Sequence, residues 1–190
     1  MARATARREA LDELTLRRAQ RGDERAWREL IERYQQPVHS LIWRMFAGRA
    51  RHRVEDLTQE TFVRVLRGLP GFDPAGPASL TSWILTIATR VTLNELRRPE
   101  AAAIEREPIG RERSDADAER RRVGAAIAAG VAELSDDHRA VFVLREYHEL
   151  EYGDIAAALE IDVGTVKSRL SRARGQLREF LTRALGGASS

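Results

Sequence analysis

The amino-acid sequence predicts an all-α protein in which two small helical domains are joined by a flexible linker. Apolar residues recur along most of the chain at three- and four-residue steps, which is the spacing of one face of an α-helix. Of the 190 residues 43% are hydrophobic, but 28 are alanine, so the bulky apolar side chains suffice for small cores only. No aromatic residue occurs between Trp83 and Phe142, which indicates that the two halves build separate cores.

The first domain is expected to cover residues 8–98 and to contain four helices. Pro37 lies within the second helix and should kink or split it, because proline removes a backbone donor and crowds the preceding turn. Residues 70–77 include three prolines and two glycines and must form a loop. Ser79 then caps the fourth helix. The helices are expected at about residues 11–19, 26–45, 54–69 and 80–98.

Residues 99–117 are expected to form the flexible linker. From residue 99 to residue 122 the chain carries six arginines and seven acidic residues, and its only bulky apolar residues are Ile104 and Ile109. Such a segment buries too little apolar surface to fold and stays solvated. Fully extended at about 3.3 Å per residue, it would reach about 80 Å, which exceeds the length of about 20 base pairs of duplex DNA.

The second domain is expected to cover residues 118–186 and to contain a helix-turn-helix. Its first helix is rich in alanine, and Ser135 with the two aspartates after it caps the next helix. Beyond Glu151, a short helix, a turn at residues 160–162 and a long helix have the outline of a helix-turn-helix. Glu160 stands where this motif commonly has a left-handed glycine, at a cost on the order of 1 kcal/mol.

The long helix after this turn is the main candidate for a DNA-binding element. Its apolar residues share one face, and Asp162 is placed to cap its start. Residues 163–178 include five basic residues and no acidic one. An ordinary solvated, arginine-rich face is the alternative, but the short helix, the turn and the charge asymmetry occur together, and arginine and lysine bind phosphates and guanine edges. The candidate DNA contacts are Thr165, Lys167, Ser168, Arg169, Arg172 and Arg174.

Composition and spacing argue against several other classes of function. The net charge of only +3 does not by itself imply a polyanionic partner. The absence of cysteine excludes disulfides, cysteine-bound zinc and thiol catalysis. The four histidines share no metal-ligand or triad spacing, and no phosphate-binding loop occurs. We therefore expect no metal site, no cofactor, no small-molecule substrate and no intrinsic catalysis. No apolar run reaches the length of a membrane helix, so we expect a cytoplasmic protein without membrane insertion.

Two sets of motifs resemble the extracytoplasmic-function group of bacterial RNA polymerase sigma factors. In the second half, RAVFVLR at 139–145, DIA at 154–156 and VGTVKSRLSRAR at 163–174 are similar to the promoter-reading C-terminal domain of that family. In the first half, DLTQETF at 56–62, FDP at 72–74 and the stretch 83–98 are similar to its N-terminal domain. Both sets occur in the family's order and cover nearly the whole chain outside the linker and the tails.

The resemblance implies roles for residues of the first domain. Asp56, Gln59 and Glu60 would contact a coiled coil of the largest polymerase subunit, and their spacing puts them on one helix face. A metal held by the carboxylates, or a plain solvated face, is the alternative. The loop 72–79 and the helix after it would meet the −10 promoter element, where a small-residue loop can hold an unstacked base. The candidate −10 contacts are Asp73, Ser79, Trp83, Arg90, Asn94, Arg97 and Arg98.

Two features of the helix after this loop qualify the resemblance. Trp83 could stack on bases, but its spacing with Ile84 and Ile87 also fits a core position. Thr86 and Thr89 stand where many relatives carry basic residues or asparagine. The preferred −10 sequence of the relatives therefore cannot be transferred to this chain.

The resemblance implies a sigma factor that binds core RNA polymerase and directs promoter-specific initiation by reading −10 and −35 elements. In that family an anti-sigma factor commonly masks both domains, so core polymerase, promoter DNA and an anti-sigma factor are the expected partners. Two other functions would use the same features. A stand-alone regulator would bind palindromic operators without polymerase, and an enzyme with a helical catalytic half and a DNA-binding tail would require a metal site.

Overall fold

The computed structural model describes residues 11–47, 52–98 and 115–186, and within these ranges all regular secondary structure is helical. The all-α prediction is confirmed. Residues 8–10 of the expected first domain and 99–114 of the expected linker lie outside the described residues. In chain order the elements are α1 (Glu13–Gln20), α2 (Glu24–Phe46), α3 (His52–Gly68), the 3-10 helix η1 (Leu69–Gly71), α4 (Leu80–Leu96), α5 (Asp115–Glu133), α6 (Asp136–Glu146), α7 (Tyr152–Leu159) and α8 (Val163–Gly186).

Aspartates begin the first two helices. The carboxylates of Asp12 and Asp23 accept hydrogen bonds from the backbone N–H groups of Thr15 and Ala26, each at 2.9 Å. These bonds satisfy donors that have no partner within the helix. They also lower the pKa of Asp12 and of Asp23, because an N–H donor stabilises the charged carboxylate. The starts of both helices are therefore encoded by the residues immediately before them.

α2 runs unbroken through Pro37, so the expectation that this proline could split the helix is wrong. A proline in a helix interior costs about 3 kcal/mol. Packing on both sides of the proline offsets this cost, because Leu30, Val38 and Leu41 are completely buried. Burying one side chain of this size contributes about 1.5–3 kcal/mol. Tertiary contacts therefore override the local preference.

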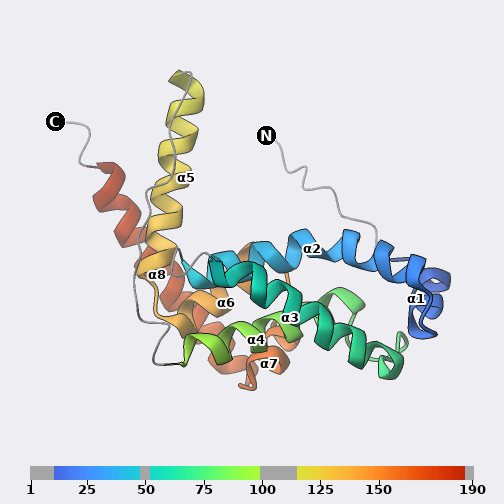
Figure 1. Ribbon diagram of the computed structural model, residues 1–190. Coiled ribbons are helices and arrows are strands. Elements are labelled where there is room, and N and C mark those ends of the chain that lie inside the picture. The colour runs from blue at the N-terminus through green and yellow to red at the C-terminus, as the bar shows by residue number, and fades with distance from the viewer. Residues whose placement is uncertain (1–10, 48–51, 99–114, 187–190) are drawn as a thin grey trace.

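The first half is a bundle in which α2, α3 and α4 pack against one another, while α1 lies on α2 beside η1 (Figure 1). α4 buries residues around most of its circumference, including Thr89 and Thr92. Their hydroxyl groups donate to the carbonyls of Leu85 and Ala88 at 2.7 Å, which removes the cost of burying them. A helix buried in this way must be covered on more than one side.

The second half is organised around α8, which packs against α5, α6 and α7. The first turns of α5 extend away from the other helices (Figure 1). Farther along, α5 approaches α8 closely at Gly130, where an added Cβ would lie 2.5 Å from Leu177 Cδ1. The helix-turn-helix formed by α7 and α8 is thus held by the two preceding helices.

The two halves also pack against each other, α4 against α7 and α2 against α6. The buried apolar side chains of the halves form one continuous core, so the expectation of two separate cores is wrong. The gap in aromatic residues did not reveal this contact, whose hydrogen bonds join Ser82 to Asp154 and Arg90 to the Ala157 carbonyl. The domain boundaries at 98 and 118 stay a prediction, but α5 begins at Asp115, so residues 115–117 of the expected linker are helical.

Candidate nucleic-acid interface

The turn between α7 and α8 has the geometry of a helix-turn-helix. Glu160 adopts the left-handed conformation, with φ 57° and ψ 43°, as its position predicts. The backbone N–H of Ile161 donates to the carbonyl of Ala156 at 3.1 Å and closes the end of α7. A residue with a Cβ in this conformation costs on the order of 1 kcal/mol. The turn therefore adopts the left-handed conformation of the motif even though Glu160 stands where glycine is favoured.

Asp162 begins α8, as expected. Its carboxylate accepts hydrogen bonds from Thr165 Oγ1 at 2.6 Å and from Thr165 N–H at 2.7 Å. These two bonds lower the pKa of Asp162, because both stabilise the ionised carboxylate. The Thr165 hydroxyl proton is thus directed at Asp162, while the hydroxyl oxygen can still accept a hydrogen bond from a DNA base.

α8 separates an apolar face from a basic one. Val166, Leu170, Ala173 and Leu177 are buried against the other helices of this half. On the opposite face Lys167, Ser168, Arg172 and Arg174 are exposed, and Thr165 and Arg169 are half-buried. All six predicted −35 residues therefore lie on the solvent-accessible side of α8, called the basic strip below, with Thr165, Ser168, Arg169 and Arg172 on one flank and Lys167 and Arg174 on the other.

Ion pairs distinguish the arginines of this strip. Arg169 lies 2.8 Å from a carboxylate oxygen of Asp137, and Arg174 lies 2.5 Å from one of Glu146. Among the described residues, Arg172 forms no ion pair of this kind, so its five donors face solvent. A guanidinium without a competing carboxylate is the better ligand for phosphate or guanine. Of the three predicted arginines on α8, Arg172 is thus the one that no carboxylate engages.

The loop between η1 and α4 forms a tight turn at its predicted base-binding end. The Asp73 carboxylate accepts a hydrogen bond from Ala75 N–H at 2.9 Å, and the Asp73 carbonyl accepts one from Gly76 N–H at 3.1 Å. Ser79 caps α4, as expected, by accepting a hydrogen bond from Ser82 N–H at 3.0 Å. An open groove of about 910 Å³ runs between this loop and α1. These hydrogen bonds hold the loop at the border of a space that can receive a ligand.

Trp83 lies in the packing behind this loop. Its ring is tilted against Phe72 with the centroids 5.1 Å apart, and its Cζ2 atom lies 3.1 Å from where a Cβ on Gly68 would stand. The side chain is half-buried, so it packs on the core and leaves part of its ring accessible. Both interpretations of Trp83 therefore remain compatible with its position. Thr89, in contrast, is completely buried, so it cannot contact a DNA strand.

The remaining predicted −10 residues lie farther along α4. Asn94, Arg97 and Arg98 are exposed near its end, and Arg98 forms an ion pair with Glu95 at 3.0 Å. Arg90 instead reaches across to the second half, where its Nη2 donates to the Ala157 carbonyl at 3.1 Å and lies 3.2 Å from a Glu160 oxygen. In this arrangement Arg90 is engaged by the helix-turn-helix.

A second exposed surface lies on α3. Asp56, Gln59 and Glu60 are exposed, and the two carboxylates bond Arg53 and Arg64 on the same helix at 3.5 and 2.7 Å. Further along α3, Val63 and Leu66 are 44% and 49% exposed. Leu66 belongs to the apolar pattern of this helix, but the structure excludes it from the core. Adjacent acidic and apolar side chains in the open fit a protein partner, and this extension was missed from the sequence.

Arg139 is buried, with 1% of its surface exposed, and the sequence analysis did not predict a structural role for it. Its guanidinium donates to the carbonyls of Val131, Ala132 and Leu134 at the end of α5, at 3.1, 2.9 and 2.5 Å. It also donates to the Met45 carbonyl near the end of α2 at 2.9 Å. The last carbonyls of a helix lack partners within it, so one side chain completes the ends of two helices from different halves.

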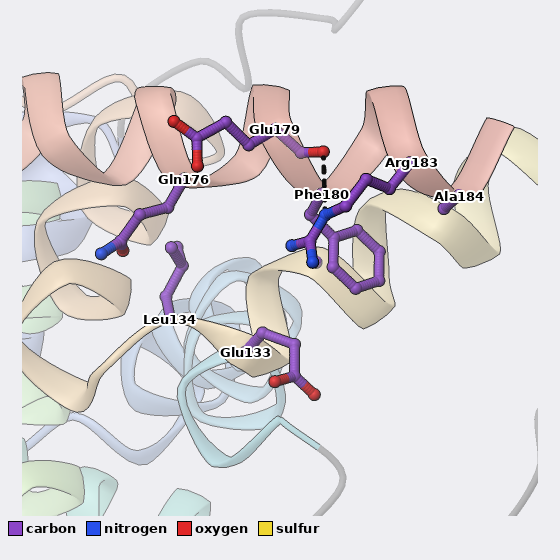
Figure 2. Close-up of a pocket in the computed structure, with 8 residues that line it drawn as sticks. Glu133, Leu134, Gln176, Glu179, Phe180, Arg183 and Ala184 are labelled. Carbon is purple, nitrogen blue, oxygen red and sulfur yellow. Dashed lines mark hydrogen bonds between the residues drawn. The ribbon is translucent and has the colours of Figure 1, made fainter. Parts of the chain in front are cut away.

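α5 and α8 border a second open groove of about 490 Å³. Figure 2 shows Phe180 projecting from α8 toward the ribbon of α5, with Glu133 and Leu134 at the end of α5. Arg183 Nε donates to the Glu179 carbonyl at 3.4 Å within α8. The lining mixes apolar and charged side chains without a set of groups arranged for catalysis among them.

Two features of the described residues bear on the alternative functions. Among the described residues no group of three or more histidine, aspartate or glutamate side chains is placed to hold a metal ion. In the same part of the chain, no helix combines the length and the apolar character needed to cross a bilayer.

Comparison with known proteins identifies matches in both halves. The protein-family model for sigma-70 region 2 matches residues 30–101, and that for sigma-70 region 4 matches residues 125–177. RNA polymerase sigma-H factor of Pseudomonas aeruginosa is 33% identical, over 90% of this chain and 93% of the relative. The ECF RNA polymerase sigma factor SigE of Mycolicibacterium smegmatis is 34% identical, over 85% of this chain, which spans 65% of that relative. The structure of CnrH in complex with the cytosolic domain of CnrY superimposes with a TM-score of 0.64 at 26% identity, covering 95% of this chain and 99% of that one.

Proposed function

The chain belongs to the extracytoplasmic-function group of bacterial RNA polymerase sigma factors, and on that premise we propose which of its surfaces act in transcription initiation. Sigma factors are initiation factors that work with RNA polymerase in the cytoplasm. Here the protein binds core polymerase and directs it to promoters with −10 and −35 elements. The observation that carries this function is the helix-turn-helix with an exposed basic strip, in a chain whose other half matches sigma region 2.

The second half, from residue 118 to residue 186, reads the −35 element. α8 enters the major groove, with Lys167 and Arg172 as the first candidates because they carry accessible charge. Arg169 and Arg174 join after leaving Asp137 and Glu146. Thr165 and Ser168 contact the same site through their hydroxyl oxygens.

The first half, from residue 8 to residue 98, binds polymerase and the −10 element. The α3 surface of Asp56, Gln59 and Glu60 contacts the polymerase, and the exposed Val63 and Leu66 extend it. The loop from Asp73 to Ser79 and the outer face of α4 meet the −10 strand. The remaining −10 contacts are Trp83, Arg90, Asn94, Arg97 and Arg98.

Binding both elements at once requires the halves to separate. Arg90 on the −10 helix contacts Glu160, three residues before the start of the −35 helix at Val163. The centres of the two elements lie about 25 base pairs apart by their names, which is about 85 Å of duplex at about 3.4 Å per step. α8, the longest helix in the described residues, has 24 residues and is about 36 Å long, which is less than half of that distance. Residues 99–117 serve as the tether between the halves: fully extended at about 3.3 Å per residue they reach about 60 Å, and the dimensions of the two halves supply the rest of the separation.

The protein has no catalytic role of its own in this proposal, since the polymerase performs the chemistry. CnrH was solved in complex with the cytosolic domain of CnrY, and a comparable anti-sigma protein binds this chain and holds it inactive. Such a partner would prevent access of polymerase and DNA to the same surfaces.

The primary experiment is run-off transcription with purified core polymerase and a promoter library. Wild-type protein gives promoter-specific transcripts that core polymerase alone does not produce. Reversing both charges, Asp56→Arg with Glu60→Arg, weakens polymerase association by about tenfold or more, because like charges at an interface cost several kcal/mol. Glu29→Arg, at an exposed position of α2, is the matched control. Unchanged polymerase binding by the double variant refutes the contact on α3.

A second experiment tests the −35 strip. Arg172→Ala costs about 1–3 kcal/mol at the −35 element only if Arg172 reads bases, and it weakens binding to all sequences equally if Arg172 binds phosphate. Binding to intact and scrambled −35 duplexes separates the two roles. Equal affinity of wild type and variant on both duplexes removes Arg172 from the interface.

A further inference from the structure

The first helix of the described chain belongs to neither family match. α1 ends at Gln20, whereas the match to sigma-70 region 2 begins at residue 30. α1 nevertheless lies beside η1 and the loop proposed to hold −10 bases (Figure 1). Its side chains therefore border a functional surface that its sequence does not predict.

Gln20 holds the start of this loop. Its side-chain amide donates to the carbonyl of Leu69 at 3.0 Å and to the carbonyl of Phe72 at 2.7 Å. The amide nitrogen of glutamine has two N–H donors, and both are used here. Leu69 is the first residue of η1 and Phe72 directly follows it, and both side chains are buried. Gln20 thus fixes the exact point at which the chain leaves the core toward Asp73.

The groove of about 910 Å³ lies between α1 and this loop. One wall consists of α1 residues, and the other consists of the loop and the start of α4. The volume falls in the range of pockets that hold small-molecule ligands, which is sufficient for one unstacked nucleotide. The lining residues used below are Arg17, Gln20 and Arg21 on α1 and Phe72, Asp73 and Ala75 on the loop.

The α1 wall supplies positive charge. Arg17 is 60% exposed and pairs with Glu13 on the same helix, an exposed pair that costs little to break. Arg21 at the end of α1 is also exposed. The loop wall, in contrast, offers the Asp73 carboxylate and apolar surface. The two walls match the two parts of an extruded nucleotide: the phosphates require cations such as the α1 arginines, and the base requires polar and apolar contacts such as those of the loop.

We propose that α1 completes the −10 strand site. Gln20 is a positioning residue that sets the loop for base capture, and Arg17 and Arg21 bind the phosphates that flank the captured nucleotide. This inference rests on the proposed function, because it deepens the site assigned there to −10 DNA. It also predicts that a chain lacking α1 would bind polymerase yet melt promoters poorly.

The test of Gln20 uses holoenzyme and a fork-junction DNA with 2-aminopurine in the −10 strand, whose fluorescence increases when the base leaves the stack. Gln20→Met keeps the length of the side chain and removes both donors. The variant should bind the fork about tenfold more weakly and give a smaller fluorescence increase. Its affinity for a −35 duplex should be unchanged. A wild-type fluorescence response, or an equal loss on the −35 duplex, overturns the positioning role.

The test of the arginines measures affinity for the same fork over a range of salt concentrations. Arg17→Ala with Arg21→Ala should reduce the slope of log affinity against log salt by about 1 to 2, because each phosphate contact releases counterions. The discrimination between −10 bases should stay as in wild type. Arg28→Ala, an exposed arginine on α2 that does not line the groove, is the control. An unchanged slope in the double variant overturns the phosphate contacts, and these exposed substitutions leave the fold intact.

Failure of the proposed function and failure of the α1 role give different experimental results. If wild-type protein yields no promoter-specific transcripts with core polymerase, the proposed function fails. If wild type is active and the Gln20 and arginine variants match it on the fork, the role of α1 fails while the proposed function stands.

Discussion

Replacing Arg139 by alanine should destabilise the protein more than any exposed substitution. The guanidinium is buried, and besides four backbone carbonyls it bonds the Asp136 carboxylate at 2.8 Å. The Asp136 carboxylate is 36% exposed and can be rehydrated, but each buried carbonyl left without a donor costs about 1–3 kcal/mol. The orphaned carbonyls at the ends of α2 and α5 contribute to the same loss, because burial keeps most water from them. We expect a decrease of about 3–5 kcal/mol in the free energy of unfolding.

Urea unfolding followed by far-UV circular dichroism measures this decrease. Arg139→Lys should recover only part of it, because an ammonium retains the charge but cannot reach carbonyls on several sides as a guanidinium does. Arg172→Ala is the matched control in the same half, and an exposed site of this kind should change stability by less than about 0.5 kcal/mol. A loss below about 1 kcal/mol for Arg139→Ala would refute the reasoning that this side chain completes two helix ends.

Three further outcomes follow from the second half and from its contact with the first. Glu160→Gly should raise the free energy of unfolding by about 1 kcal/mol, because glycine adopts φ near 57° without strain; Glu160→Ala, which keeps a Cβ, should show no gain in the same urea titration. Burial, with a smaller effect of the Arg44 guanidinium, lowers the pKa of His148 to about 4, so between about pH 6.5 and pH 4 the unfolded chain binds a proton that the folded chain does not. The free energy of unfolding should therefore fall by about 3 kcal/mol in total as the pH drops through this range. In unfolding titrations over a series of pH values, His148→Gln should lack this decrease. Ser82 Oγ donates to Asp154 Oδ2 at 2.7 Å across the halves, so Ser82→Cys with Asp154→Cys should form one disulfide in this cysteine-free chain. The disulfide should block run-off transcription until it is reduced, but it should leave binding to the −35 duplex intact. An oxidised protein as active as the reduced one would contradict the need for the halves to separate.

The helix starts and the recognition helix could be predicted from local sequence. Ser79 and Asp162 cap α4 and α8 because a side-chain oxygen next to the first N–H groups satisfies them wherever the helix sits in the fold. The left-handed Glu160 followed from the spacing of the turn. The accessible strip on α8 followed from the apolar periodicity, since a helix that buries one face must expose the other.

Other features depended on contacts between distant residues. Pro37 lies inside an unbroken helix because Leu30 and Val38 are buried against other helices, a gain that no local rule contains. Leu66 fits an apolar stripe in the sequence and yet is exposed. Whether an apolar residue is covered depends on what lies opposite it.

The sequence by itself determined the helices, their caps, the basic strip of α8 and the family. Only the tertiary structure decided that Arg139 joins α2 to α5, that Gln20 reaches η1 across about fifty residues of chain, and that α4 packs on α7. The physical reason is range. Caps and periodicity act within a few residues, whereas a buried guanidinium or amide finds its carbonyl acceptors only after distant helix ends have been brought together by packing.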